Sequence, residues 1–163
     1  MEKVLVSSCL VGNKVRYNAS CLSIPNLDWE WLNSHVELVV FCPEVSGGLP
    51  TPRAPAEIVN GKGMEVVNGL AHVMGNDGID VTKQFLLGAH KALEICQKHG
   101  IKYAILAEGS PSCGSTKIYD GTFSGNKIDG FGVTTAVLAD VGIKVFSQHT
   151  VEMLRAELSK QEN

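Results

Sequence analysis

Three of the five cysteines share one kind of position, just after a short apolar run, and they are Cys9, Cys42 and Cys113. If these runs are strands of a parallel sheet, their exits lie along one edge, where α/β proteins bind ligands. We therefore expect the three thiols to converge. A single loop cysteine is well explained as a small apolar residue, but three in Gly/Pro/Ser-rich strand exits favour a metal or cluster site.

Three thiolates suit a soft metal centre. Structural zinc takes four protein ligands, and catalytic zinc usually includes a histidine. Iron–sulfur clusters are held by cysteine thiolates, commonly four for [4Fe–4S], so three would leave one iron open as a Lewis acid for a sulfur-bearing substrate. The chain has no CxxC pair, and the spacing by itself leaves zinc and iron–sulfur open.

The other two cysteines differ from these three. Cys96 lies on the apolar stripe of a predicted helix, where a free cysteine packs as a small hydrophobe. Cys21 follows Asn18-Ala19-Ser20 and is either a fourth ligand or an ordinary loop residue.

The pattern of apolar residues indicates an α/β protein. Continuous apolar runs predict strands buried on both faces, at 3–7, 37–41, 103–107 and 144–147. Apolar residues at three- and four-residue spacing, with turn residues at the ends, predict helices at 27–33, 81–99, 133–140 and 151–159. We expect a mostly parallel, Rossmann-like sheet flanked by helices.

Residues 56–59 and 64–67 flank Asn60-Gly61-Lys62-Gly63, which predicts a small β-hairpin insertion around 56–67. This insertion is too small to own a core, and a length of 163 residues suits a single domain spanning 1–163.

Composition narrows the class of protein. The chain is 44% hydrophobic and 19% charged, which is typical of a folded globular protein, and its formal charge of −3 makes a nucleic-acid partner unlikely. Its start lacks the features of a signal peptide, and no apolar run is long enough for a membrane span. We expect a cytoplasmic protein with no membrane partner, in which an odd number of cysteines does not indicate a disulfide framework.

Three motifs together carry a family resemblance. They are Ser8-Cys9-Leu10-Val11-Gly12 with Arg16-Tyr17, Cys42-Pro43-Glu44-Val45-Ser46-Gly47-Gly48-Leu49 with Pro52-Arg53-Ala54-Pro55-Ala56-Glu57, and Ser110-Pro111-Ser112-Cys113-Gly114. With these motifs the chain resembles the thiouracil desulfurase family, from about residue 3 to residue 147.

The resemblance implies an enzyme that removes sulfur from a thiolated pyrimidine without redox chemistry. It implies a [4Fe–4S] cluster held by Cys9, Cys42 and Cys113, whose open iron binds the substrate sulfur while water attacks the carbon and hydrosulfide leaves. It also implies that Glu44 and Ser110 activate this water. A carboxylate can accept the water proton and a hydroxyl can orient the water, and burial near an anionic cluster should raise the pKa of Glu44.

Each of these two residues has a structural alternative. Glu44 could instead cap a helix, and Ser110 could be a turn hydroxyl beside Pro111.

Substrate recognition is less well defined by the sequence. We expect Arg16, Arg53 and Ser112 to contribute to it, although the arginines could instead neutralise the cluster, remain solvated or pair with Glu57.

Two departures from the family pattern bear on the substrate. Asn18-Ala19 stands where the family typically has Asp-Gly, and Ala107-Glu108 stands where a lysine often precedes the third motif. The alternative function is a non-catalytic metal- or cluster-binding protein that handles sulfide or binds thiolated RNA.

Overall fold

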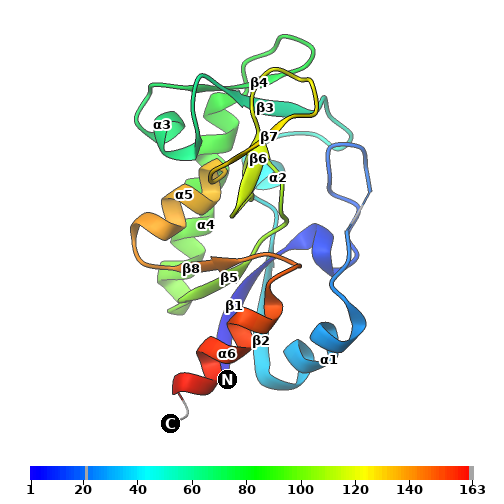
Figure 1. Ribbon diagram of the computed structural model, residues 1–163, viewed down its shortest axis with the longest axis vertical. Coiled ribbons are helices and arrows are strands. Elements are labelled where there is room, and N and C mark those ends of the chain that lie inside the picture. The colour runs from blue at the N-terminus through cyan, green and yellow to red at the C-terminus, as the bar shows by residue number, and fades with distance from the viewer. Residues whose placement is uncertain (21, 162–163) are drawn as a thin grey trace.

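The computed structural model describes residues 1–20 and 22–161, and its centre is a parallel sheet of four strands (Figure 1). The strands run in the order β2–β1–β5–β8, with bounds β1 Glu2–Ser7, β2 Val36–Phe41, β5 Tyr103–Ile105 and β8 Lys144–Phe146. All three pairings are parallel. This arrangement confirms the predicted α/β class and the four predicted strands.

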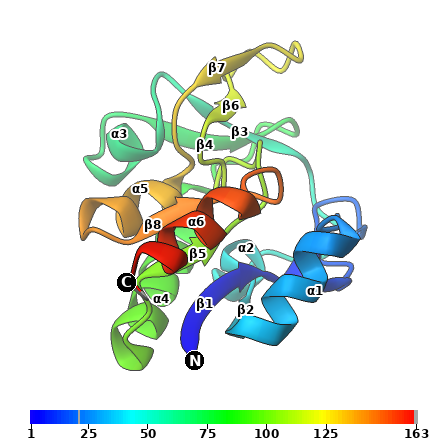
Figure 2. The same cartoon turned by 60° about the horizontal axis from the view of Figure 1, so that its bottom comes forward.

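Helices cover both faces of the sheet (Figure 2). The helices are α1 (Asn26–His35) and α6 (Val151–Gln161) on one face, and α4 (Thr82–His99) and α5 (Val133–Asp140) on the other. Successive residues of β1 point into opposite layers, because side chains alternate along a strand. Val4 and Val6 pack with α1 and α6, whereas Leu5 packs with α4 and α5.

The four predicted helices are all present, and the ends of α4 show why. The Asp80 carboxylate accepts a hydrogen bond of 2.8 Å from the N–H of Thr82 at the start of the helix. At the other end Gly100 has φ 66°, a left-handed conformation that glycine adopts without strain. Its N–H donates to the carbonyl of Cys96 and ends the helix.

The predicted hairpin has different boundaries from those expected. β3 (Ala56–Val59) pairs antiparallel with β4 (His72–Gly75), and the segment predicted as the second strand is a short helix, α3 (Gly63–Val67). The valines of this segment favoured a strand, but it is too short for its apolar spacing to distinguish strand from helix. Packing against α5 and the residues just before it decides, since Gly63 donates a 2.9 Å hydrogen bond to the carbonyl of Phe131 and Val66 is buried.

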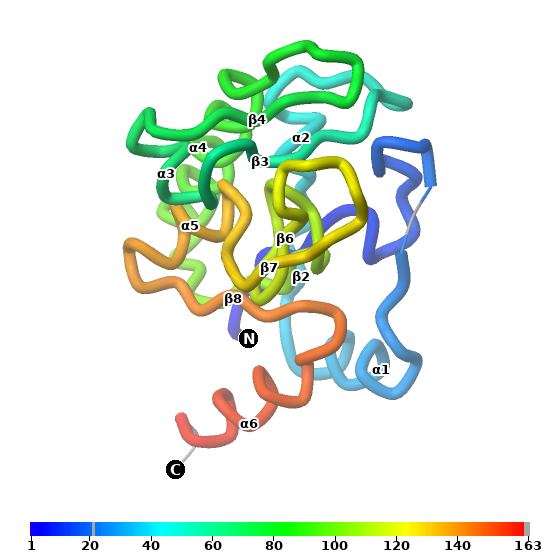
Figure 3. Tube along the Cα trace, turned by 45° about the horizontal axis from the view of Figure 1, so that its top comes forward, coloured from blue at the N-terminus to red at the C-terminus, as the bar shows by residue number. Residues whose placement is uncertain are grey.

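A second antiparallel hairpin, which the sequence analysis did not predict, joins β6 (Lys117–Tyr119) to β7 (Lys127–Asp129). The two hairpins lie side by side at one end of the molecule (Figure 3). They share a third core with α3 and the first half of α4, in which Ile58, Phe85 and Ile118 are buried. Within the described ranges no helix is both long and apolar enough to cross a membrane.

Candidate active site

The carboxyl ends of three neighbouring strands define the site. β1 continues into the 3-10 helix η1 (Ser8–Val11), which contains Cys9. β2 leads directly into α2 (Pro43–Ser46), and Cys42 is the N-cap residue of that short helix. The loop after β5 carries Cys113. Because the chain moves from β1 to β2 on one side and β5 lies on the other, a crevice opens beyond the end of β1, as is usual in such sheets.

The three predicted thiols line one cavity of about 400 Å³. Cys9 and Cys113 are buried, Cys42 is half-buried, and none of the three forms a disulfide. The sheet therefore brings together residues that lie far apart in the sequence, as the parallel-strand argument predicted.

The thiols lie close enough to one another to perturb their ionisation. Burial and the neighbouring Cys42 raise the pKa of Cys9 to about 11, against the opposing effect of Arg16. Burial also raises the pKa of Cys113, and Glu44 and the other two cysteines act in the same direction. The thiols are therefore protonated at neutral pH in the cluster-free chain, and a metal must displace these protons when it binds.

The donor set fits a cluster more readily than a single ion. Across residues 1–20 and 22–161, no group of three or more Cys, His, Asp or Glu side chains is arranged to hold one metal ion. The three thiols line one cavity, and Arg16 and Arg53 lie close enough to lower the pKa of Cys9 and Cys42, respectively. Three thiolates with cations beside them suit an anionic iron–sulfur cluster.

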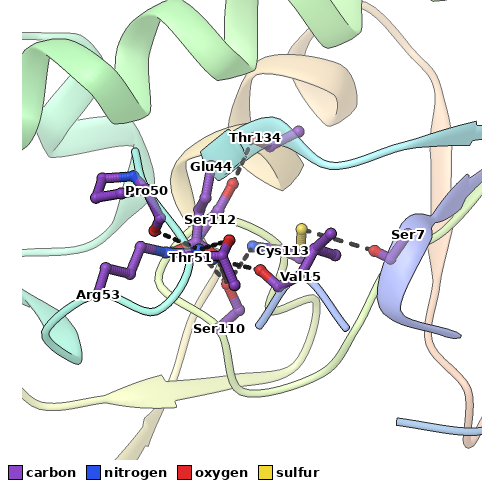
Figure 4. Close-up of polar contacts among 10 residues, drawn as sticks. All are labelled: Ser7, Val15, Glu44, Pro50, Thr51, Arg53, Ser110, Ser112, Cys113 and Thr134. Carbon is purple, nitrogen blue, oxygen red and sulfur yellow. Dashed lines mark hydrogen bonds and ion pairs between the residues drawn. The ribbon is translucent and has the colours of Figure 1, made fainter. Parts of the chain in front are cut away.

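Glu44 joins two of the cysteine segments (Figure 4). Glu44 lies on α2, and its Oε2 accepts a 3.5 Å hydrogen bond from the hydroxyl of Ser110 in the Cys113 loop. The same oxygen lies 3.6 Å from Nη2 of Arg53, and the Glu44 side chain is 18% exposed. Burial raises the pKa of Glu44, as expected from the sequence, and Arg53 opposes this shift. The structure therefore places a carboxylate and a hydroxyl in the wall that contains the thiols.

Arg53 is held rigidly at this wall, and its side chain is only 6% exposed. Its Nη1 donates to the carbonyl of Pro50 and the hydroxyl of Thr51, and its Nη2 donates to the carbonyl of Val15 at 2.9 Å. Its buried Nε has no partner. Pairing with Glu57 was one of the alternatives that the sequence left open, but within the described residues the carboxylate beside Arg53 is that of Glu44.

The predicted residue Arg16 also lines the cavity. Its guanidinium lies 5.7 Å from the ring centroid of Tyr17, and its Nη1 donates to the Ser20 hydroxyl.

The predicted role of Ser112 in substrate binding is not supported by its position. Ser112 is fully buried, is absent from the cavity wall, and shares a 2.7 Å hydrogen bond with the hydroxyl of Thr134. It fixes the Cys113 loop to the start of α5 instead, and the carbonyl of Ser112 accepts the N–H of Thr134. Cys96 is buried in the core away from the cavity, as expected, and Cys21 lies outside the described residues.

Several residues of the cavity were not predicted from the sequence. Ser7 ends β1, and its hydroxyl donates to the sulfur of Cys113 at 3.8 Å while accepting the N–H of Ala107. The sequence does place a serine at the end of an apolar strand, and this polar residue at a strand exit could have indicated Ser7 as a site residue. Tyr119 and Lys127 also line the cavity, but they belong to the β6–β7 hairpin, which the sequence pattern did not reveal.

Comparisons with known proteins identify the family of this chain. The family model described as 2-thiouracil desulfurase matches residues 4–150. The uncharacterized protein YbbK of Bacillus subtilis is 45% identical over 146 residues, which cover 90% of this chain and 95% of YbbK. A solved structure of the [4Fe–4S]-dependent thiouracil desulfidase TudS superposes with a TM-score of 0.86 at 45% identity, covering 98% of this chain and 99% of that one. The match to the family model spans most of the chain, and this protein therefore belongs to the 2-thiouracil desulfurase family.

Proposed function

We propose that this protein is a [4Fe–4S]-dependent enzyme that replaces the thiocarbonyl sulfur of a thiolated pyrimidine with oxygen from water. Its membership of the 2-thiouracil desulfurase family and its similarity to TudS support the cofactor and the class of reaction. The observation that carries the proposal for this chain is the single cavity lined by three thiols from neighbouring strand exits together with Glu44 and Ser110.

Cys9, Cys42 and Cys113 are the residues that would hold the cluster. When bound through three cysteines, a [4Fe–4S] cluster supplies one iron without a protein ligand, which is a Lewis acid with affinity for sulfur. Arg16 and Arg53 offset the negative charge that accumulates at this wall, since both lie close enough to lower the pKa of a cysteine.

Glu44 and Ser110 would act on the water. The carboxylate of Glu44 accepts a proton as the water oxygen attacks the thiocarbonyl carbon. The Ser110 oxygen accepts the N–H groups of Ser112 and Cys113, and its O–H, which points to Glu44 at 3.5 Å, would turn to that water and orient it. The balance is C=S plus H₂O giving C=O plus H₂S, so no electrons are gained or lost. The half-buried position of Glu44 keeps competing solvent away from the carboxylate.

Arg53 would orient the substrate. Its guanidinium lines the cavity and is fixed by the carbonyls of Pro50 and Val15, so its positive charge stays at one place in the wall. This charge would attract a carbonyl oxygen of a pyrimidine ring. A cavity of about 400 Å³ accommodates a small-molecule base, and we propose a thiouracil-like compound as the substrate class.

The test is anaerobic reconstitution followed by metal analysis and turnover. We expect about four irons and about four sulfides per chain, and conversion of 4-thiouracil to uracil with release of sulfide. Cys113→Ser should lose iron and activity, whereas Cys96→Ser, the matched control in the core, should keep both.

A second variant isolates the role of the water. Glu44→Gln should keep its iron and lose most of its rate, because the amide cannot accept the water proton. An unchanged rate would remove the role of Glu44. Bound iron without turnover of any thiolated pyrimidine would favour the non-catalytic alternative, and bound zinc would refute the cluster assignment.

A further inference from the structure

One carboxylate outside the set already described carries an unusual number of hydrogen bonds. Oε1 of Glu108 accepts backbone N–H groups at 3.0–3.2 Å, from Gly109, Ser115, Thr116 and Lys117. Its Oε2 accepts the hydroxyls of Thr116 at 2.7 Å and Ser115 at 3.3 Å. The Glu108 side chain is therefore hydrogen-bonded to both ends of the 109–117 loop and to none of the residues in its middle.

The loop that Glu108 closes is the one that carries Cys113. Within it the hydroxyl of Ser110 accepts the N–H groups of Ser112 at 3.0 Å and Cys113 at 3.2 Å. The N–H of Gly114 donates to the carbonyl of Ser110 at 2.9 Å. These hydrogen bonds, together with those of the Glu108 side chain, fix the positions of the Cys113 thiol and the Ser110 hydroxyl.

The environment of Glu108 favours its ionised form. Burial opposes ionisation, but hydrogen bonds from Thr116, Lys117 and Ser115 outweigh it and lower the pKa of Glu108. Consecutive N–H groups that point at one anion form a backbone nest. A side chain without negative charge would leave this nest poorly satisfied.

The backbone of Glu108 is fixed as well. Its N–H donates at 2.9 Å to Oε1 of Gln148, which is buried after β8. On its far side the Cys113 loop is held by the start of α5, where the N–H of Val133 donates to the carbonyl of Pro111. The loop is therefore held from two sides, and Glu108 supplies the side that lines the cavity.

We propose that Glu108 is a positioning residue that holds the 109–117 loop so that Cys113 retains the cluster and Ser110 stays aligned with Glu44. This role rests on the proposed function for the identity of the bound group. It does not require Glu108 to contact the substrate.

The test compares Glu108→Ala and Glu108→Gln with the matched control Glu57→Gln. Glu57 is a buried carboxylate in the same cavity wall that also accepts backbone N–H groups, from Gly121 and Phe123, but it lies outside the Cys113 loop. The first measurement is amide hydrogen exchange of residues 109–117 in the cluster-free chain. The second is the rate of iron release to a chelator after anaerobic reconstitution, and the third is kcat and KM for 4-thiouracil.

We expect Glu108→Ala to speed exchange in the 109–117 segment. We also expect it to speed iron release by roughly 10–100-fold, the usual effect of losing a support of a metal ligand. It should lower kcat more than it raises KM. Glu108→Gln keeps the Oε1 that accepts four N–H groups, so we expect partial rescue of all three measurements. Glu57→Gln should loosen residues 121–123 and leave iron release unchanged.

If amide exchange and iron release in Glu108→Ala are as slow as in the wild type, the proposal is overturned, even if the melting temperature falls. A residue that only stabilises the fold would change the melting temperature and neither of these rates. If Glu108→Ala does not fold, Glu108→Gln decides by the same two rates. If the wild type turns over no thiolated pyrimidine but the Glu108 variants release iron faster, the proposed reaction fails and the positioning role stands. If turnover is normal and the variants hold iron and loop as the wild type does, the positioning role fails alone.

Discussion

Replacement of Gly88 by alanine should reverse the usual effect of that substitution within a helix. Gly88 lies inside α4, where alanine is normally more favourable than glycine by about 1 kcal/mol. A Cβ at this position would lie 1.9 Å from the carbonyl oxygen of Pro43 in α2. The contact is reciprocal, since a Cβ on Gly47 would lie 2.0 Å from the carbonyl oxygen of Gln84. α2 therefore packs backbone against backbone on α4.

The size of the effect follows from these distances. Real Cβ atoms essentially never approach another heavy atom within 3.0 Å, so the two helices must separate by the difference from 1.9 Å, about 1.1 Å. Overpacking of this kind costs about 1–3 kcal/mol, so after the gain of about 1 kcal/mol in helix propensity the net loss is up to about 2 kcal/mol. Because α2 follows Cys42 and carries Glu44, a shift of this size should also slow turnover by up to about 100-fold.

Urea unfolding of the cluster-free chain measures the first effect, and kcat per bound iron measures the second. The control is His90→Ala, an exposed position two residues further along α4, which should leave both quantities near their wild-type values. A Gly88→Ala protein that is as stable and as active as the wild type would refute the argument that close backbone contact positions α2.

Four other outcomes are expected. Ser112→Ala should lower the free energy of unfolding in urea by about 1–3 kcal/mol, because the buried Thr134 hydroxyl loses its partner; unchanged stability would show that another group replaces it. Ala19 has φ 58°, so Ala19→Gly should raise that free energy by up to about 1 kcal/mol, and a clear loss would contradict the strain. The folded pKa of Glu108 lies below its ordinary 4.5, so the unfolded chain binds more protons and stability falls as pH drops through 4.5 and below; acid titration of Glu108→Gln should show a shallower fall, and an equal slope would argue against this linkage. Chelation of the iron should lower the melting temperature, since a group bound only by the folded chain stabilises it, and an unchanged value would indicate that the cluster does not bind the native site.

The sequence predicted the sheet and the gathering of the thiols because both follow from general rules. Runs such as residues 37–41 and 103–107 are apolar on both faces, which is characteristic of parallel strands under helices. Parallel strands exit at one edge, so Cys9, Cys42 and Cys113 could be placed together without any knowledge of their contacts.

The features that were missed depend on contacts between distant segments. The segment 64–67 is helical because Gly63 approaches the backbone of Phe131, and β3 pairs with β4, beyond that helix. Ser112 could not be separated from Ser110 by sequence, because which hydroxyl faces the cavity is set by the partner that Thr134 provides. The bonds of Glu108 were invisible for the same reason.

The sheet order also constrains when the site can come into existence as the chain is made. β1 and β2 pair with each other and hold Cys9 and Cys42 at a common edge, and both strands precede α4 in the chain. The third thiol joins them only when β5 pairs with β1 on its free side. A nascent chain that stops before β5 lacks Cys113 and the loop that carries it, so we expect a metal group to be inserted only after the sheet is complete.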